Sequence, residues 1–375
     1  METSRMKVTL AFDSFKGSLT AADACRIAGE AILEVHPEAQ VICAPMADGG
    51  EGTASALLTA RPGEWIPVPT TGPLPSQCVD AGFAWFASDQ TAVVEMASAS
   101  GLTLLRRDQL NPLATSTRGT GELLCAARDH GARRILLAVG GSATVDGGMG
   151  AAHALGWRFL DHDGHELTPC GGHLESIARI VPPTAKTAVP PIEVLADVTN
   201  PLGEAARVFG PQKGATPSAV EKLAGGLDNL ARRWREDLGV EVALLAGGGA
   251  AGGLAAGAVA FFGARIVSGI ETVMRETDFA AALQGADWVI TGEGSFDQQS
   301  LQGKVVSGVI TQARSAIVKT AVIAGRVNLE QPIWIQAGIT YTASLASAAL
   351  PTEEAIRRAP ELLRDQVLRF AQEWL

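Results

Sequence analysis

Short apolar runs alternate with longer alanine-rich segments along most of this chain, and glycine-rich loops separate the two. Residues 7–12, KVTLAF, and 134–139, RILLAV, are typical of buried strands, whereas residues 19–35, LTAADACRIAGEAILEV, have the composition of a helix. Thr20 and Asp23 have the spacing of a helix-capping box at the start of that segment, with aspartate in place of glutamate. Repeated strand, loop and helix units predict an α/β fold with mainly parallel sheets.

Six of the apolar runs end in loops that contain glycine or polar residues. Because the carboxyl ends of parallel strands lie along one edge of a sheet, such loops lie where ligands bind in open α/β folds. Any single aspartate in such a loop can be a helix cap or a turn residue. Several together predict a site, and the aspartates in these loops are Asp13, Asp48, Asp146, Asp197 and Asp297. We therefore predict that these side chains converge.

Three segments depart from this alternation. Residues 61–75, RPGEWIPVPTTGPLP, are rich in proline and predict a linker or a crossing between domains. Residues 159–167 predict a hairpin with an Asp-Gly turn, which makes His162 and His165 turn residues rather than metal ligands. Residues 242–264 carry no charge but include seven glycines, so they predict the buried strand VALLA, a glycine turn and an alanine-rich helix instead of a membrane span.

Length, charge and cysteine usage limit the class of protein. A chain of 375 residues is long enough for two domains, since one core rarely grows beyond roughly 250 to 300 residues. The net charge of -10 disfavours nucleic acid and anionic membrane surfaces as partners. The five cysteines form no Cys-x-x-Cys pair, and the apolar run near Met1 is too short for a signal peptide, so we expect a protein of the reducing cytoplasm.

The loops around the aspartates have the chemistry of a phosphate site. Glycine and small hydroxyl residues stand beside aspartate in residues 47–53, ADGGEGT, and 140–148, GGSATVDGG. Backbone N–H groups of such loops can approach a phosphate closely, and a divalent cation between carboxylate and phosphate removes their repulsion. Lys16 and Lys304 lie in two of the loops and can neutralise charge on a transferred phosphoryl group. The pattern therefore favours phosphoryl transfer.

Two other classes of protein stay open on the residues alone. Gly247, Gly249 and Gly252 satisfy the G-x-G-x-x-G pattern after a strand-like run, which predicts a dinucleotide site and a dehydrogenase, although Glu271 lies a little far for the ribose contact. A protein that only binds small anions would keep the glycine loops but has no need of aspartates beside lysines. Residues 301–306, LQGKVV, lack the flanking residues of a P-loop.

Seven motifs follow one another along the chain: AFDSFKGSLTA, MADGGEGT, GTGELL, GGSATVDGGMG, DVTNPL, FGPQKGA and GEGSFDQQSLQGK. Together they resemble the type 1 glycerate kinase family over nearly the whole chain. The resemblance implies phosphorylation of D-glycerate that depends on ATP and Mg²⁺. The product is commonly 2-phosphoglycerate, and 3-phosphoglycerate is the alternative. It places this reaction in the breakdown of organic acids, glyoxylate or sugar acids.

The resemblance also implies an architecture of two α/β domains. One is flavodoxin-like, with a mainly parallel sheet formed by both chain ends, residues 1–70 plus 285–375. The other is an inserted α/β domain, residues 71–284, and the active site lies in the cleft between them. The substrates are glycerate and ATP, neither nucleic acid nor a membrane is a partner, and a homodimer is one option for the assembly.

Roles for individual residues follow from the resemblance and the loops together. Asp297 or Asp197 accepts the proton of the glycerate hydroxyl or holds it through magnesium, while Lys16 and Lys304 stabilise the transferred phosphoryl group. The candidate metal ligands are Asp48, Asp197 and Asp297, and Asp13 can also position the ion. Ser295 stands where similar proteins often have an arginine. Substrate or phosphate is expected at Asp13, Ser14, Gly17, Ser18, Gly49, Gly50, Gly52, Thr53, Gly140, Gly141, Ser142, Thr144, Gly292 and Gly294.

Overall fold

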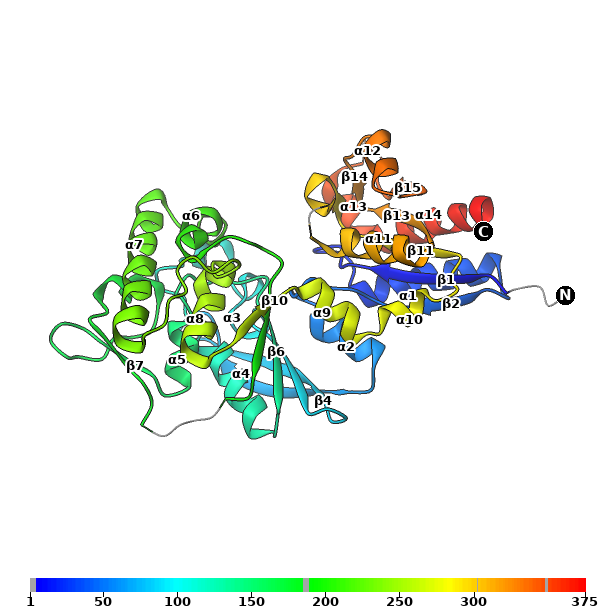
Figure 1. The fold of residues 1–375 in the computed structure, drawn as a ribbon. Coiled ribbons are helices and arrows are strands. Elements are labelled where there is room, and N and C mark those ends of the chain that lie inside the picture. The colour runs from blue at the N-terminus through cyan, green and yellow to red at the C-terminus, as the bar shows by residue number, and fades with distance from the viewer. Residues whose placement is uncertain (1–4, 185–188, 302, 348–349) are drawn as a thin grey trace. The chain divides into compact units, whose positions relative to one another are not determined.

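The chain forms two units, each with its own sheet. The structure, a computed structural model, describes residues 5–184, 189–301, 303–347 and 350–375 (Figure 1). Unit 1 contains both ends of the chain and comprises Met1–Asp48, Ser55–Pro62 and Ile270–Leu375. Unit 2 comprises Gly49–Ala54 and Gly63–Gly269.

Unit 1 is built on a parallel sheet of five strands. The strands are β1 (Lys7–Phe12), β2 (Gln40–Cys43), β11 (Trp288–Gly292), β13 (Lys319–Ala324) and β15 (Tyr341–Ser344). They lie in the order β15-β13-β11-β1-β2, and each neighbouring pair is parallel. Numbered along the chain, this is the order 2-1-3-4-5 of flavodoxin-like folds. The prediction of a flavodoxin-like sheet formed by both chain ends is therefore confirmed.

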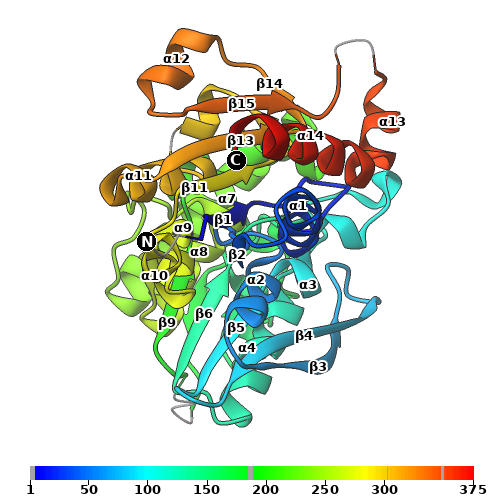
Figure 2. The same cartoon turned by 90° about the vertical axis from the view of Figure 1, so that its right-hand side faces the viewer.

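Helices cover both faces of this sheet, which is why its central strands β1, β11 and β13 are mainly apolar and buried. On one face α1 (Ala21–Val35) packs beside α14 (Ala359–Trp374) against Val8, Leu10 and Phe12 of β1 (Figure 2). On the other face α9 (Gly269–Glu276), α10 (Phe279–Leu283) and α11 (Val305–Ala316) share a core with alternate residues of β1 and β11. Shorter elements complete the unit: α2 (Thr53–Ala60), β12 (Ser295–Phe296), β14 (Arg326–Val327), α12 (Gln331–Gln336) and α13 (Thr352–Arg357).

The start of α1 follows the capping signal of the sequence. Thr20 has extended backbone, and its hydroxyl oxygen accepts a hydrogen bond from the Asp23 N–H at 3.0 Å. The Asp23 carboxylate accepts from the Thr20 hydroxyl at 2.7 Å and also pairs with Arg26. The cap therefore satisfies one of the N–H groups that the first helical turn leaves without a partner.

Unit 2 contains a mixed sheet of six strands. The strands are β3 (Glu64–Thr71), β4 (Cys78–Phe86), β5 (Thr91–Glu95), β6 (Arg134–Ala138), β9 (Ile192–Leu195) and β10 (Arg265–Val267). They lie in the order β10-β9-β6-β5-β4-β3. The first four are parallel, and β4 and β3 continue the sheet as antiparallel strands. A small antiparallel pair, β7 (Arg158–Leu160) with β8 (Arg179–Val181), lies apart from it.

The helices of unit 2 include one apolar helix, α8 (Leu254–Phe262), which contributes to two cores. The other α-helices are α3 (Ala97–Ser100), α4 (Arg118–Asp129), α5 (Met149–Ala154), α6 (Ala205–Phe209) and α7 (Pro217–Arg233). Leu254 and Ala258 of α8 join the core beneath the sheet, whereas Ala256 and Phe261 join a second core with α7. Burial on nearly all sides explains the uncharged composition of α8. Within the described part of the chain, no helix has the length and apolar character that a membrane span requires.

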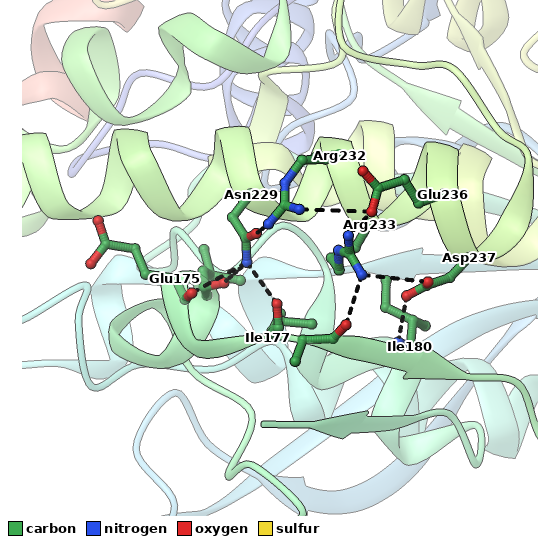
Figure 3. A network of polar contacts seen from close by, with 10 residues as sticks. Glu175, Ile177, Ile180, Asn229, Arg232, Arg233, Glu236 and Asp237 are labelled. Carbon is green, nitrogen blue, oxygen red and sulfur yellow. Dashed lines mark hydrogen bonds and ion pairs between the residues drawn. The ribbon is translucent and has the colours of Figure 1, made fainter. Parts of the chain in front are cut away.

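The end of α7 and the π-helical turn after it, Trp234–Leu238, fix the segment that leads into β8 (Figure 3). The Asn229 amide donates to the carbonyl oxygens of Leu174 and Ile177 at 2.8 and 2.9 Å. The Ile180 N–H donates to the Asp237 carboxylate at 2.8 Å, and the Arg233 guanidinium donates to the Ala178 carbonyl oxygen at 2.7 Å. Backbone groups between Leu174 and Ile180 are thus paired by side chains of α7 and of the turn after it.

One sequence expectation about local structure is confirmed in part and another is wrong. Residues 61–75 do contain the crossing between the units, at Pro62 and Gly63, but most of them form β3 and not a free linker. Pro67 and Pro69 fit there because β3 is an edge strand that needs no outward N–H donor. The run VALLA forms no strand, since Leu244 within it is 90% exposed and β10 occupies the place beside β9. The Asp-Gly turn is confirmed: Leu160 and Glu166 form an antiparallel bridge around it. The longer partner of β7 is nevertheless β8.

Candidate active site

In unit 1, acidic residues gather where the strand order reverses, between β1 and β11. Asp13 directly follows β1, and its N–H donates to the Gly292 carbonyl oxygen at 2.9 Å. Glu293 directly follows β11, and Asp48 lies in the loop between β2 and α2. In parallel α/β sheets, this carboxyl edge at the point of reversal is where ligands bind.

The carboxyl group of Asp13 is strongly perturbed. Burial, the neighbouring charge of Asp48 and, more weakly, the charge of Glu293 raise its pKa to about 7. The Ser14 N–H, which donates to Asp13 Oδ1 at 2.6 Å, and the more distant charge of Lys16 act in the opposite direction. Asp13 is therefore expected to titrate near neutral pH, whereas an aspartate in water is fully ionised there.

Glu293 is the acid that sequence analysis missed. Burial raises its pKa, as do the charges of Asp297 and Asp48, whereas the Ser300 hydroxyl and Lys304 lower it. Its Oε1 atom is buried and has no hydrogen-bond partner among the described residues. A buried carboxylate oxygen without a partner is costly unless a ligand completes it. The available signal was its position directly after a strand, in the turn Gly-Glu-Gly.

Asp297 and Lys304 border the same acid. Asp297 begins a short 3₁₀ turn, because its carboxylate accepts from the Gln299 N–H at 2.8 Å and its N–H donates to the Ser300 hydroxyl at 3.0 Å. Lys304 lies directly before α11 in extended conformation. Both side chains influence the pKa of Glu293, so the predicted pair does lie near the acids of the sheet edge.

The loop after β1 is a tight turn closed by its own hydrogen bonds. The Ser18 hydroxyl donates to the Phe15 carbonyl oxygen at 3.0 Å, and Gly17 has a φ of +78° that favours glycine. Lys16 is exposed at the tip of this turn. Gly292 has a packing reason as well, since a Cβ there would lie 1.8 Å from the Ile323 carbonyl oxygen.

In unit 2, the loop 140–144 follows β6 and approaches the glycine loop at 49–52. The Gly140 N–H donates to the Gly49 carbonyl oxygen at 3.2 Å, and a Cβ on Gly140 would lie 2.5 Å from the Gly50 Cα. A Cβ on Gly49 would lie 2.6 Å from the Leu195 carbonyl oxygen. Close backbone approach therefore explains these glycines, whether or not Gly141 and its neighbours also bind an anion.

Asp146 has a structural environment. It is fully buried, and its carboxylate accepts four hydrogen bonds: from the N–H and hydroxyl of Thr117 and from the N–H groups of Gly148 and Gly150. Burial raises its pKa, and these hydrogen bonds lower it. The chain itself supplies donors to both carboxylate oxygens, so Asp146 fixes the turn before α5.

Asp197 also makes contacts within unit 2. Its Oδ1 accepts from the Ser268 hydroxyl at 2.8 Å and from the Gly269 N–H at 3.0 Å, where α9 begins. Of the predicted metal ligands, Asp48 and Asp297 belong to unit 1 and Asp197 to unit 2. The predicted convergence on one magnesium ion stays a prediction for this set.

Glu95 is a second acid that sequence analysis missed. It ends β5 in a buried position and accepts from the Ala54 N–H at 2.6 Å and from the Gly52 N–H. Burial raises its pKa, and these two donors lower it. A helix N-terminus attracts an anion, and here the chain supplies one of its own to α2. The donors of the 49–53 loop that remain for phosphate are fewer than the sequence indicates.

The glycine run at 247–253 is not a dinucleotide loop. Within the described residues no strand lies directly before this run, and Glu271 lies on α9 in the other unit. A Cβ on Gly252 would lie 2.1 Å from the Thr144 carbonyl oxygen, and the Gly249 N–H donates to the Asn200 carbonyl oxygen. The glycines therefore serve close packing of backbone against backbone.

Asp161, Asp163 and His165 have potential ligand atoms within 4.8 Å of one another. They lie on the mainly exposed turn after β7, where the Asp161 carboxylate accepts from the N–H groups of Asp163 and His165. These hydrogen bonds explain the cluster as a turn, as the sequence predicted for His165.

Comparison with known proteins gives matches over almost the entire chain. The model of a family described as the glycerate kinase family matches residues 8–375. A glycerate kinase of Halalkalibacterium halodurans is 41% identical over 97% of each chain, and a glycerate 2-kinase of Escherichia coli is 39% identical over 94% of each. A crystal structure of a protein assigned as glycerate kinase 2 from Salmonella typhimurium LT2 is 39% identical, covers 98% of each chain and superposes with a TM-score of 0.84.

Proposed function

Because this chain belongs to the glycerate kinase family, we propose that it transfers the terminal phosphoryl group of ATP to the 2-hydroxyl of D-glycerate. The observation that carries the proposal is the acid cluster of Asp13, Asp48 and Glu293 at the carboxyl edge of the unit 1 sheet. Three carboxylates there oppose an anionic substrate unless positive charge lies between them. A magnesium ion bound together with ATP supplies that positive charge.

The donor set of this edge fits a magnesium ion. Magnesium prefers one or two carboxylates together with phosphate oxygens, and the unpartnered Oε1 of Glu293 is such a carboxylate oxygen. Glu293 and Asp48 would hold the ion, with Asp297 as a further ligand. A cation held there neutralises charge on the phosphate oxygens. Asp197 remains a proposed ligand from the other unit.

Asp13 is the acid best suited to accept the proton of the glycerate hydroxyl. A general base works most efficiently when its pKa lies near the working pH, and the pKa of Asp13 is about 7. Asp297 and Asp197 stay as alternative proton acceptors. Lys16 and Lys304 can neutralise charge that spreads over the transferred group. The 140–144 loop and the free donors of 49–53 would hold a phosphate or the glycerate carboxylate.

We place this reaction in the breakdown of organic acids, glyoxylate or sugar acids, and in a reducing compartment. All five cysteines are free thiols, as a reducing compartment requires. A chelator should stop turnover and leave the circular dichroism spectrum unchanged, since the cation is shared with the substrate. Loss of the spectrum on adding chelator would instead make the metal structural.

The test is ADP formation by the purified protein with D-glycerate, ATP and magnesium. Omission of glycerate is the control, and phosphorus NMR of the product separates the 2-phosphate from the 3-phosphate. We expect ADP formation that depends on glycerate, with the 2-phosphate as product. A parallel incubation with NAD and glycerate tests the dehydrogenase, and a nicotinamide absorbance change without ADP formation would overturn the proposal.

A further inference from the structure

The motif FGPQKGA places a lysine in the interior of unit 2. Lys213 ends the 3₁₀ turn Pro211–Lys213 and is 2% exposed. Gly214, with a φ of +90°, turns the chain directly after it. Lysine is rarely buried to this extent, because an ammonium group loses its hydration there. The proposed chemistry of the site gives this residue no role so far.

The amine of Lys213 contacts the 140–144 loop from beneath. Its Nζ atom donates to the Ser142 hydroxyl oxygen at 2.7 Å and to the Thr144 carbonyl oxygen at 2.7 Å. No carboxylate of the described residues lies within ion-pair distance of it, although the charge of Asp146 favours the ammonium form. Burial acts in the opposite direction and lowers the pKa of Lys213 to about 7. The contacts are therefore directed at the loop, not at a salt bridge.

These contacts decide what the loop can offer a ligand. A hydroxyl that accepts from an ammonium keeps its own hydrogen for another acceptor, and among the described residues Ser142 donates to none. The Thr144 hydroxyl is fully buried and also lacks a partner there. The backbone between them is fixed, since the Ala143 N–H donates to the Ser100 carbonyl oxygen at 2.9 Å. The buried amine thus contacts the Ser142 hydroxyl oxygen in a way that leaves its hydrogen available to a ligand.

We propose that Lys213 is a positioning residue, which orients the Ser142 hydroxyl so that the 140–144 loop donates to an anionic oxygen of a substrate. The inference rests on the proposed function, because that function supplies the anion. Two sources share this chemistry, a phosphate of ATP and the carboxylate of glycerate. The Thr115 hydroxyl donates to the Ala143 carbonyl oxygen at 3.0 Å, and Asp146 holds the chain just beyond the loop through Thr117, so the loop is fixed before the ligand arrives.

Kinetics of Lys213→Met, Ser142→Ala and the double variant test the inference. We expect each single change to raise the KM of one and the same substrate by about tenfold, which corresponds to one lost hydrogen bond to a charged group. The double variant should resemble Lys213→Met alone, because the lysine acts through the serine. Lys222→Met, which removes an exposed lysine of α7, is the matched control and should leave both KM values unchanged.

The substrate whose KM rises identifies the anion, ATP for a phosphate and D-glycerate for the carboxylate. Unchanged KM values with a lowered melting temperature would make Lys213 purely structural and overturn the inference, as would equal rises for both substrates. If Lys213→Met does not fold, Ser142→Ala decides by the same criterion. Calorimetric titration of wild type and Ser142→Ala with ATP and with glycerate measures the affinity for each substrate without turnover. It therefore separates failure of this inference from failure of the kinase proposal.

Discussion

Two groups of buried acids in this protein have opposite surroundings. Asp146 of unit 2 accepts four hydrogen bonds from the chain around it and has no exposed surface. At the sheet edge of unit 1, Asp13 accepts from one backbone N–H, and the Oε1 of Glu293 has no partner among the described residues. Both groups follow strands in glycine-rich loops. The comparison teaches that hydrogen-bond satisfaction, and not position after a strand, separates a structural acid from one that awaits a ligand.

The largest effect is expected at the sheet edge, in Asp13→Asn. Loss of the proton acceptor should lower kcat by about 1000-fold, within the range for general-base catalysis. The melting temperature should stay equal or rise, because the change removes a carboxylate from beside Asp48 and Glu293. Steady-state kinetics and thermal unfolding measure the two. Asp365→Asn on the exposed side of α14 is the control, and a kcat within threefold of wild type would remove Asp13 from the reaction.

The opposite result is expected from Asp146→Asn. The new amide group would face N–H donors of Thr117, Gly148 or Gly150, which leaves at least one buried group unpaired. Urea denaturation should show that the free energy of unfolding is lower than that of wild type by about 3 kcal/mol. Asp80→Asn, at an exposed position of β4, should cost nothing measurable. Stability equal to wild type would mean that this acid is not the structural member of the comparison.

Lys304→Met sharpens the comparison within unit 1. The change keeps most of the packing of the side chain and removes the charge that lowers the pKa of Glu293. We expect kcat to fall by about 100-fold, as for loss of one donor to the transition state, with little change in stability. Asp297→Asn should act at least as strongly. A nearly silent lysine change would show Lys304 to be a solvated charge before α11.

The smallest effect is the pH dependence of kcat/KM. An aspartate with the ordinary pKa of 3.8 stays ionised from pH 5 to 8, whereas the pKa of Asp13 is raised to about 7. Magnesium held by Asp48 and Glu293 would lower this pKa, because it neutralises charges that help to raise it. As pH falls through the pKa that Asp13 has with the cation bound, Asp13 takes up a proton and can no longer accept one from the substrate. The value of kcat/KM should therefore decrease about tenfold for each pH unit below that pKa. The residual activity of Asp13→Asn should lack this limb, and a flat wild-type profile would contradict the assignment.

The sequence predicted the parts of the fold that depend on local pattern. The central strands of unit 1, such as β1, are the apolar runs of the sequence, and Thr20 caps α1 where its spacing indicated. The prediction of a strand at VALLA was wrong because composition does not reveal exposure. The edge strand β3 was not predicted because it contains Pro67 and Pro69. These errors arise where tertiary packing, not local preference, decides the structure.

Within the candidate site, the sequence identified loops better than it identified partners. Asp13, Asp48 and Lys304 were predicted from their positions after strands or in glycine loops. Lys213 and Ser142 lie 71 positions apart, and Glu95 and Ala54 lie 41 apart, so no local pattern could join them. Whether an aspartate is satisfied or exposed to a ligand also depends on such distant partners. That is why Asp146 was grouped with the functional acids.

The most direct test of the central claim is glycerate-dependent ADP formation by wild type and Glu293→Gln at equal folded protein concentration. Glutamine keeps the volume of the side chain and removes the charge whose buried oxygen lacks a partner. The account predicts turnover by wild type, a decrease of about 100-fold or more in the variant, and equal melting temperatures. Equal turnover by the two proteins would contradict the claim that the acids between β1 and β11 form the active site.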